Sequence, residues 1–100
     1  MIIYNVTVNV EDSIHDEWLG WSREVHIPEV LQTGMFSECR LCRVLNDEDT
    51  GKTYSFQYSC DSMDKYNRYI SEFAPALRAA VSKKFGDKFI AFRTLLEVIE

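Results

Sequence analysis

The sequence predicts an α+β domain in which two helices cover one face of a four-stranded antiparallel sheet. Four segments alternate apolar and polar residues, which is the period of a strand, and two other segments repeat apolar residues at the spacing of a helix. Along the chain these segments follow the order β-α-β-β-α-β. Because 100 residues leave room for one hydrophobic core, we expect a single domain over residues 1–100.

The first strand and the first helix follow from a change of period near residue 11. Residues 2–10 carry an apolar side chain at every second position, as a strand does. The next apolar residues recur at helical spacing, at Ile14, Trp18, Trp21 and Val25. Since Pro28 disfavours helical geometry at the residue before it, we expect this helix to end near His26. A short further turn over residues 29–33 then ends at Gly34.

A β-hairpin follows the first helix. Its strands are residues 36–45 and 52–60, both rich in aromatic, branched or cysteine side chains. Residues 46–51 between them are mainly acidic or small, as in the connection of a hairpin. We therefore expect an acidic, exposed tip.

The second helix is longer and contains a proline. Asp61 or Ser62 can cap its amino end, and Gly86 ends it. Its apolar stripe consists of Met63, Tyr66, Ile70, Phe73, Leu77 and Val81. Pro75 lies within that stripe and cannot donate a backbone hydrogen bond, so we expect one kinked helix rather than two helices.

Residues 88–99 form the last strand and complete the order of the ferredoxin-like fold. We assign one alternating set to the face that meets the helices: Ile90, Phe92, Leu96 and Val98. The other set, assigned to the opposite face, is Phe89, Ala91, Arg93, Leu95 and Glu97.

The sheet face opposite the helices is called the open face below, and its predicted composition is unusual. The face of an independent monomer should be charged, because water covers it. Here it mixes apolar with uncharged polar residues: Ile3, Asn5, Thr7, Thr53, Ser55, Gln57, Phe89, Ala91, Arg93 and Leu95. Such a surface favours burial against a second copy of the chain, and a two-fold dimer buries both open faces with one self-complementary patch.

Several segments resemble a known superfamily. Residues 18–36, with the aromatic helix, His26-Ile27-Pro28 and Gly34-Met35-Phe36, resemble a passage of the dimeric α/β-barrel superfamily. That superfamily includes antibiotic-biosynthesis-type monooxygenases, muconolactone isomerases, stress-responsive barrel proteins and ether-degradation-associated proteins. A closer resemblance rests on Tyr4-Asn5-Val6-Thr7, the His26-Ile27-Pro28 segment, Gln57-Tyr58 and residues 91–96 taken together. These segments resemble a short bacterial family known only as a domain of unknown function. The resemblance implies the ferredoxin-like fold and a homodimer, but no particular reaction.

Charge and motifs exclude several classes of function. A net charge of −5 lacks the broad positive field that binds nucleic acid or an anionic membrane, so we expect neither partner. The amino end has no basic segment followed by an apolar run, which favours a cytoplasmic location. No glycine-rich phosphate loop, metal-ligand cluster or cofactor fingerprint is present, so we expect no cofactor and no metal. Cys39 and Cys42 are spaced as C-x-x-C, but on a strand their side chains point to opposite faces.

Six residues are candidates for a binding or catalytic site. At the end of the first helix, His26 can act as a general acid or base, and a helix carboxyl end should raise its pKa; it can equally be a capping and packing residue. On the open face, Arg93 can bind a carboxylate or an enolate oxygen, or form an interface ion pair. The remaining candidates, which would orient a ligand in a dimer cavity, are Asn5, Thr7, Gln57 and Tyr58.

Three functions remain open from the sequence. The first is a homodimeric module that binds a small molecule or a partner. The second, suggested by the resemblance, is a cofactor-independent monooxygenase- or isomerase-like enzyme for a small anionic or aromatic substrate, in which His26 or a tyrosine moves a proton and Arg93 stabilises an anion. The third is a purely structural role, in which all candidate residues pack an interface. A cavity reaching both His26 and Arg93 favours one of the first two.

Overall fold

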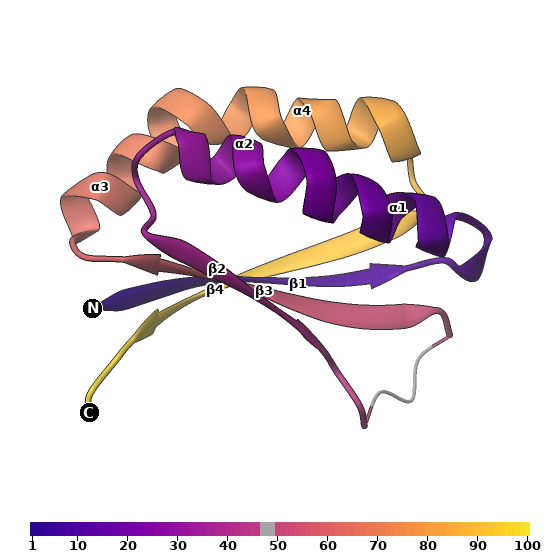
Figure 1. Ribbon diagram of the computed structural model, residues 1–100, viewed down its shortest axis with the longest axis horizontal. Coiled ribbons are helices and arrows are strands. Elements are labelled where there is room, and N and C mark those ends of the chain that lie inside the picture. The colour runs from indigo at the N-terminus through magenta and orange to yellow at the C-terminus, as the bar shows by residue number, and fades with distance from the viewer. Residues whose placement is uncertain (47–49) are drawn as a thin grey trace.

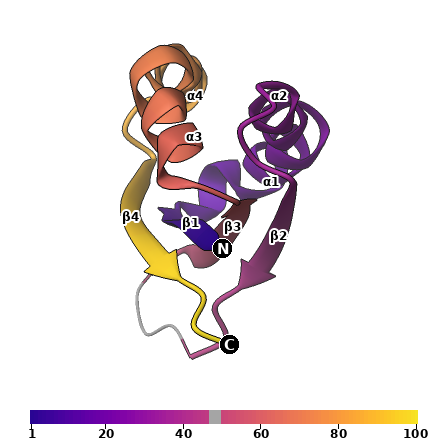
Figure 2. The same cartoon turned by 90° about the vertical axis from the view of Figure 1, so that its left-hand side faces the viewer.

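The computed structural model describes residues 1–46 and 50–100 and has the predicted ferredoxin-like α+β architecture (Figure 1). Four antiparallel strands in the order β2-β3-β1-β4 form one sheet. The strands are β1 (Ile2–Val10), β2 (Glu38–Arg43), β3 (Lys52–Cys60) and β4 (Phe89–Glu97). The helical segments are η1 (Asp12–Ile14), α1 (His15–Trp21), η2 (Ser22–His26), α2 (Ile27–Gln32), α3 (Met63–Arg68), η3 (Tyr69–Phe73) and α4 (Ala74–Phe85). Both helical rods lie on the same side of the sheet, beside one another, and leave its other face uncovered (Figure 2).

The core lies between the sheet and the helices. Central strand β1 pairs with β3 over Tyr4–Tyr58 and Val8–Tyr54, and all four of these side chains are buried. The helices contribute further buried residues, among them Trp18, Val30, Tyr69, Ala74 and Phe85. Burial of Tyr4, Val8 and Val10 on one alternating face of β1, next to the aromatic rings of β3, is the physical reason that the register of this strand is fixed.

Strand β2 is shorter than the predicted 36–45 and pairs Cys39 with Tyr58 and Cys42 with Ser55. Tyr58 is buried beneath the helices, whereas Ser55 belongs to the open face. The prediction that Cys39 and Cys42 point to opposite faces is therefore confirmed. Part of the predicted acidic tip, residues 47–49, lies outside the described residues.

Each helical rod is continuous and contains one π turn, η2 or η3. The prediction that the first helix ends near His26 is wrong, because Ile27 keeps helical angles (φ −59°, ψ −47°) and α2 continues to Gln32. The Ile27 amide donates to the carbonyl of Ser22, five residues back. This wide turn moves the preceding carbonyls, so the ring of Pro28 fits without ending the helix.

The second rod contains the same arrangement, a π turn followed by a proline. The Ala74 amide donates to the carbonyl of Tyr69, and Pro75 follows the π turn at the same offset as Pro28 follows η2. The prediction of one helix through Pro75 is confirmed, and the irregularity is a π turn placed before the proline. Ser62 caps the amino end of this rod, where its side chain accepts a hydrogen bond from the Lys65 amide at 3.2 Å.

The facing of β4 differs from the prediction. Arg93 pairs with Val6 and Ala91 pairs with Val8, so both lie on the helix-covered face. Ile90 and Phe92 instead lie on the open face, where they are 58% and 66% exposed. Both alternating sets of this strand are largely apolar, so periodicity alone cannot distinguish its two faces; pairing with β1 decides.

Candidate functional site

A cavity of about 380 Å³ lies between the helices and the sheet. Its volume is within the range of small-molecule sites, roughly 300–1,000 Å³. Every strand except β2 contributes to its walls, as do both helical rods. The lining residues are Tyr4, Val6, Val8, Trp18, Trp21, Ser22, His26, Val30, Phe56, Tyr58, Tyr69, Leu77, Arg78, Val81, Ser82, Phe89, Ala91 and Arg93.

Aromatic side chains form much of the wall. The rings of Trp21 and His26 stack with centroids 5.3 Å apart and an angle of 17° between their planes. Trp18 meets Phe56 edge to face at 5.7 Å. These contacts hold flat, rigid surfaces around the cavity, which suits a ligand with an apolar or aromatic body.

The two π turns place polar side chains in this apolar wall. The turn η2 contributes Ser22 and His26, and η3 contributes Tyr69. A π turn inserts one extra residue into a helix and thereby changes which side chains face a neighbour, which is one reason such turns occur at functional sites. Helical periodicity alone therefore missed Ser22 and Tyr69 as site residues.

His26 is uncharged in the folded protein at neutral pH. Burial lowers its pKa from 6.5 to about 4, and its Nδ1 atom has no hydrogen-bond partner among the described residues. The predicted rise in the pKa is wrong, because the helix continues past His26 and leaves the ring in an apolar wall instead of at a helix carboxyl end.

Tyr58 carries a second buried polar atom. Its hydroxyl lacks a hydrogen-bond partner of good geometry among the described residues, although the Cys39 thiol is close enough to interact with it. Burial raises the pKa of Tyr58 far above its usual value and, more moderately, raises that of Cys39 to about 11. Both groups are therefore protonated at neutral pH, and the Tyr58 hydroxyl has the Cys39 thiol as a polar neighbour among the described residues.

Two arginines bring positive charge to the cavity. Arg93 reaches it from β4, and Arg78 reaches it from α4 and donates from Nη2 to the Tyr4 hydroxyl at 3.0 Å. Arg78 was not predicted from the sequence. One feature of the sequence could have indicated it: Arg78 directly follows Leu77 of the apolar stripe, in the middle of a helix that packs on the sheet.

Three predicted site residues lie elsewhere. Asn5, Thr7 and Gln57 belong to the open face, where they form a hydrogen-bonded chain with Ser55. Gln57 donates to Ser55 at 3.3 Å, Ser55 donates to Asn5 at 2.5 Å, and Asn5 donates to Thr7 at 3.1 Å. The structure thus brings His26, Tyr58 and Arg93 together in one cavity and separates them from the amide side chains. The expectation that Arg93 lies among those amides is wrong, for the reason given for β4.

Within residues 1–46 and 50–100, no three His, Cys, Asp or Glu side chains gather in a group that could hold a metal ion. Over the same ranges, every helix falls short of the length and hydropathy needed to cross a lipid bilayer.

The lowered pKa of His26 predicts a pH-dependent stability. Since the folded pKa of about 4 lies below the ordinary 6.5, the unfolded chain takes up this proton first as the pH falls. The neutral His26 side chain therefore contributes to the free energy of unfolding above pH 6.5. This contribution, up to about 3 kcal/mol, is lost as the pH falls from 6.5 to 4. We expect His26→Phe, which keeps the ring stacked on Trp21, to flatten urea-unfolding free energies over this interval. If the free energy of unfolding of His26→Phe fell with pH as steeply as that of the wild type, His26 would not be the source of the pH dependence.

Solved structures with the same fold have low sequence identity to this chain. A dimeric ferredoxin-like protein from an uncultured marine organism is 10% identical, with a TM-score of 0.76 over 99% of this chain and 95% of its own. The cofactor-independent oxygenase SnoaB from Streptomyces nogalater, in a mutant form, is 11% identical, with a TM-score of 0.68 over 99% of this chain and 93% of its own.

A third similar structure is a mutant of MhuD with two manganese protoporphyrin IX bound per active site. It is 16% identical, with a TM-score of 0.71 over 100% of this chain and 96% of its own. At these identities the similarity establishes the fold alone. No curated protein matches the sequence. A family model does match, over residues 1–99, and the chain therefore belongs to the family described as Domain of unknown function (DUF4286).

Proposed function

We propose that this protein binds a small organic molecule with an apolar or aromatic body in the cavity between its helices and its sheet. The observation that carries the proposal is the cavity itself, about 380 Å³ and walled by rigid aromatic rings. A fully packed core would leave no such volume, because protein interiors are close-packed. The buried Nδ1 atom of His26 and the buried Tyr58 hydroxyl supply hydrogen-bonding groups to orient a ligand.

The proposal includes a cytoplasmic homodimer that forms through the open face. Ile90, Phe92 and Leu96 are exposed on that face beside the Asn5-centred hydrogen-bonded chain. Two solved structures of this fold are described as dimeric ferredoxin-like proteins. A two-fold axis through the open face would cover the apolar groups of both copies and leave the cavity of each free. Three free cysteines favour a reducing compartment.

The experiment is calorimetric titration with 2-naphthoate and 2-naphthamide, two aromatic probes of similar size. We expect saturable binding and a rise in Tm with probe concentration. Ala91→Phe adds a phenyl group on the cavity wall, so it should abolish binding while the protein stays folded. Ala80→Phe adds the same group on an exposed position of α4 and should bind like the wild type. Equal binding by both variants would place the ligand elsewhere.

A second candidate function is proton-transfer chemistry without a cofactor, favoured by the neutral imidazole of His26 in the cavity wall. A neutral imidazole can accept a proton from a bound acid, and the cationic arginines can stabilise the anion that results. SnoaB, which shares the fold, is described as a cofactor-independent oxygenase. Recovery of every bound compound unchanged supports a binding module, and release of an altered compound supports an enzyme.

A further inference from the structure

The cavity has an unbalanced charge. Its lining includes two arginines and no aspartate or glutamate, although the chain as a whole carries a net charge of −5. The cationic character is therefore local and opposite in sign to the rest of the molecule. A cavity with that composition attracts anions.

Neither guanidinium is neutralised by a carboxylate of the described residues. Within the described part of the chain, Arg78 and Arg93 form no ion pair, whereas Lys52, Lys65, Arg68 and Lys84 each pair with a carboxylate. The single side-chain hydrogen bond given by Arg78 goes to the Tyr4 hydroxyl, which is neutral. A guanidinium has five N–H donors, so most donors of both residues remain available.

The two arginines line the cavity from opposite walls. Arg78 extends from α4, and Arg93 extends from the helix-covered face of β4, where it neighbours Val6. Both interact electrostatically with Tyr69: burial raises the pKa of Tyr69 to about 12, and the two guanidiniums oppose that rise. Two like charges in one cavity repel, and since no described carboxylate pairs with either of them, an anion bound between them would offset that repulsion.

We propose that Arg78 and Arg93 form a two-cation subsite that takes the carboxylate of an aromatic or otherwise apolar acid. This inference rests on the proposed function and names its ligand class. The carboxylate accepts hydrogen bonds from both guanidiniums beside the Tyr4 and Tyr69 hydroxyls, and the apolar body extends toward Trp21 and His26. Planar guanidinium and planar carboxylate match in geometry, which makes this pairing directional as well as strong.

The test compares 2-naphthoate with 2-naphthamide, which differ in charge and little in shape. We expect the wild type to bind 2-naphthoate about tenfold more tightly or better, and this preference to fall in high salt. The double variant Arg78→Met/Arg93→Met should bind both probes about equally, with its 2-naphthamide affinity within roughly twofold of the wild type. Arg93→Met alone should lose part of the preference and keeps the Arg78–Tyr4 bond, in case the double variant does not fold.

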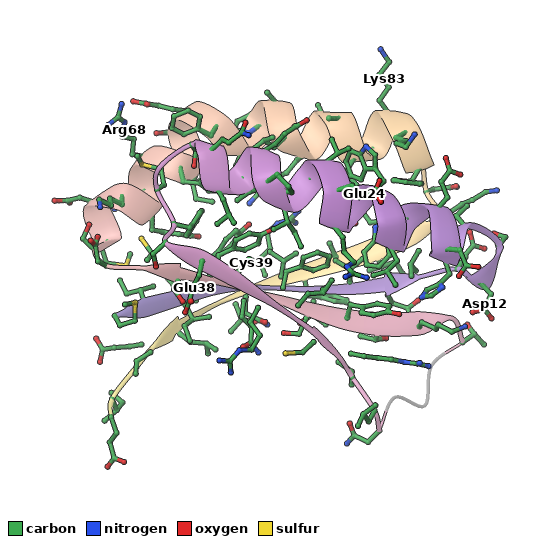
Figure 3. All side chains as sticks on the ribbon, viewed as in Figure 1. Asp12, Glu24, Glu38, Cys39, Arg68 and Lys83 are labelled. Atoms are coloured by element: carbon green, nitrogen blue, oxygen red, sulfur yellow. The ribbon has the colours of Figure 1, made fainter. Side chains whose placement is uncertain are left out.

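Arg68→Met is the matched control. It removes the same charge from α3, where the Arg68 side chain points away from the sheet and pairs with Glu72 at 2.9 Å (Figure 3). We expect it to retain the full preference for 2-naphthoate. Equal affinity of the wild type for the two probes, or a preference that survives in Arg93→Met and the double variant, would overturn the subsite and leave the cavity's proposed function standing. Absence of binding by both probes would overturn both.

Discussion

Gly51→Ala is expected to lower the free energy of unfolding by about 3 kcal/mol or more. Gly51 directly precedes β3 and has φ of +79°, a region that an L-residue adopts only at a cost of about 1–2 kcal/mol. A β-carbon at this position would also overlap the backbone carbonyl oxygen of Val10. Val10 is fully buried at the end of β1, so its backbone cannot move aside cheaply.

Gly34→Ala separates the cost of backbone strain from the cost of steric overlap with Val10. Gly34 has nearly the same φ, +78°, but a β-carbon there meets no atom within 4 Å. Gly34→Ala should therefore lower the free energy of unfolding only by the cost of backbone strain, about 1 kcal/mol. Urea or thermal unfolding of both variants measures the difference. If the two variants were equally destabilised, the close approach of Gly51 to Val10 would be wrong.

Phe92→Asp is expected to convert the proposed homodimer into a folded monomer. Phe92 is 66% exposed on the open face, beside Thr7 of β1. In the dimer a carboxylate here would be buried against the partner's apolar side chains without a counter-ion, and this cost should weaken association about 100-fold or more. Sedimentation at micromolar concentration measures the shift, and circular dichroism checks the fold.

Met63→Asp is the control for this variant. Met63 is 43% exposed at the start of α3, away from the open face, and an aspartate suits the amino end of a helix. Its sedimentation should match that of the wild type. A monomeric wild type, or a Phe92→Asp variant that remains dimeric, would show that the open face is not the interface.

The fold could be predicted because local patterns are clear in most of the chain. Strand β1 alternates without interruption, and the helix stripes are regular outside the prolines. That one sheet face stays uncovered was also predictable, since two helices cover only one side of the sheet, but the residues that β4 contributes to that face were predicted wrongly. Of the candidate site residues, His26, Tyr58 and Arg93 line the cavity between helices and sheet, whereas the sequence placed Tyr58 and Arg93 in a dimer cavity with Asn5, Thr7 and Gln57.

The sequence by itself determined the order of the elements and the chemistry available: histidines, several tyrosines and several arginines in an acidic chain. Only the tertiary structure decided which of these groups meet. Pairing of Val6 with Arg93 turned one arginine toward the helices, and the π turn before Pro75 precedes the α4 segment that carries Arg78 to the same cavity. The physical reason is that periodicity fixes which residues share a face, whereas burial against a partner element fixes which face turns inward.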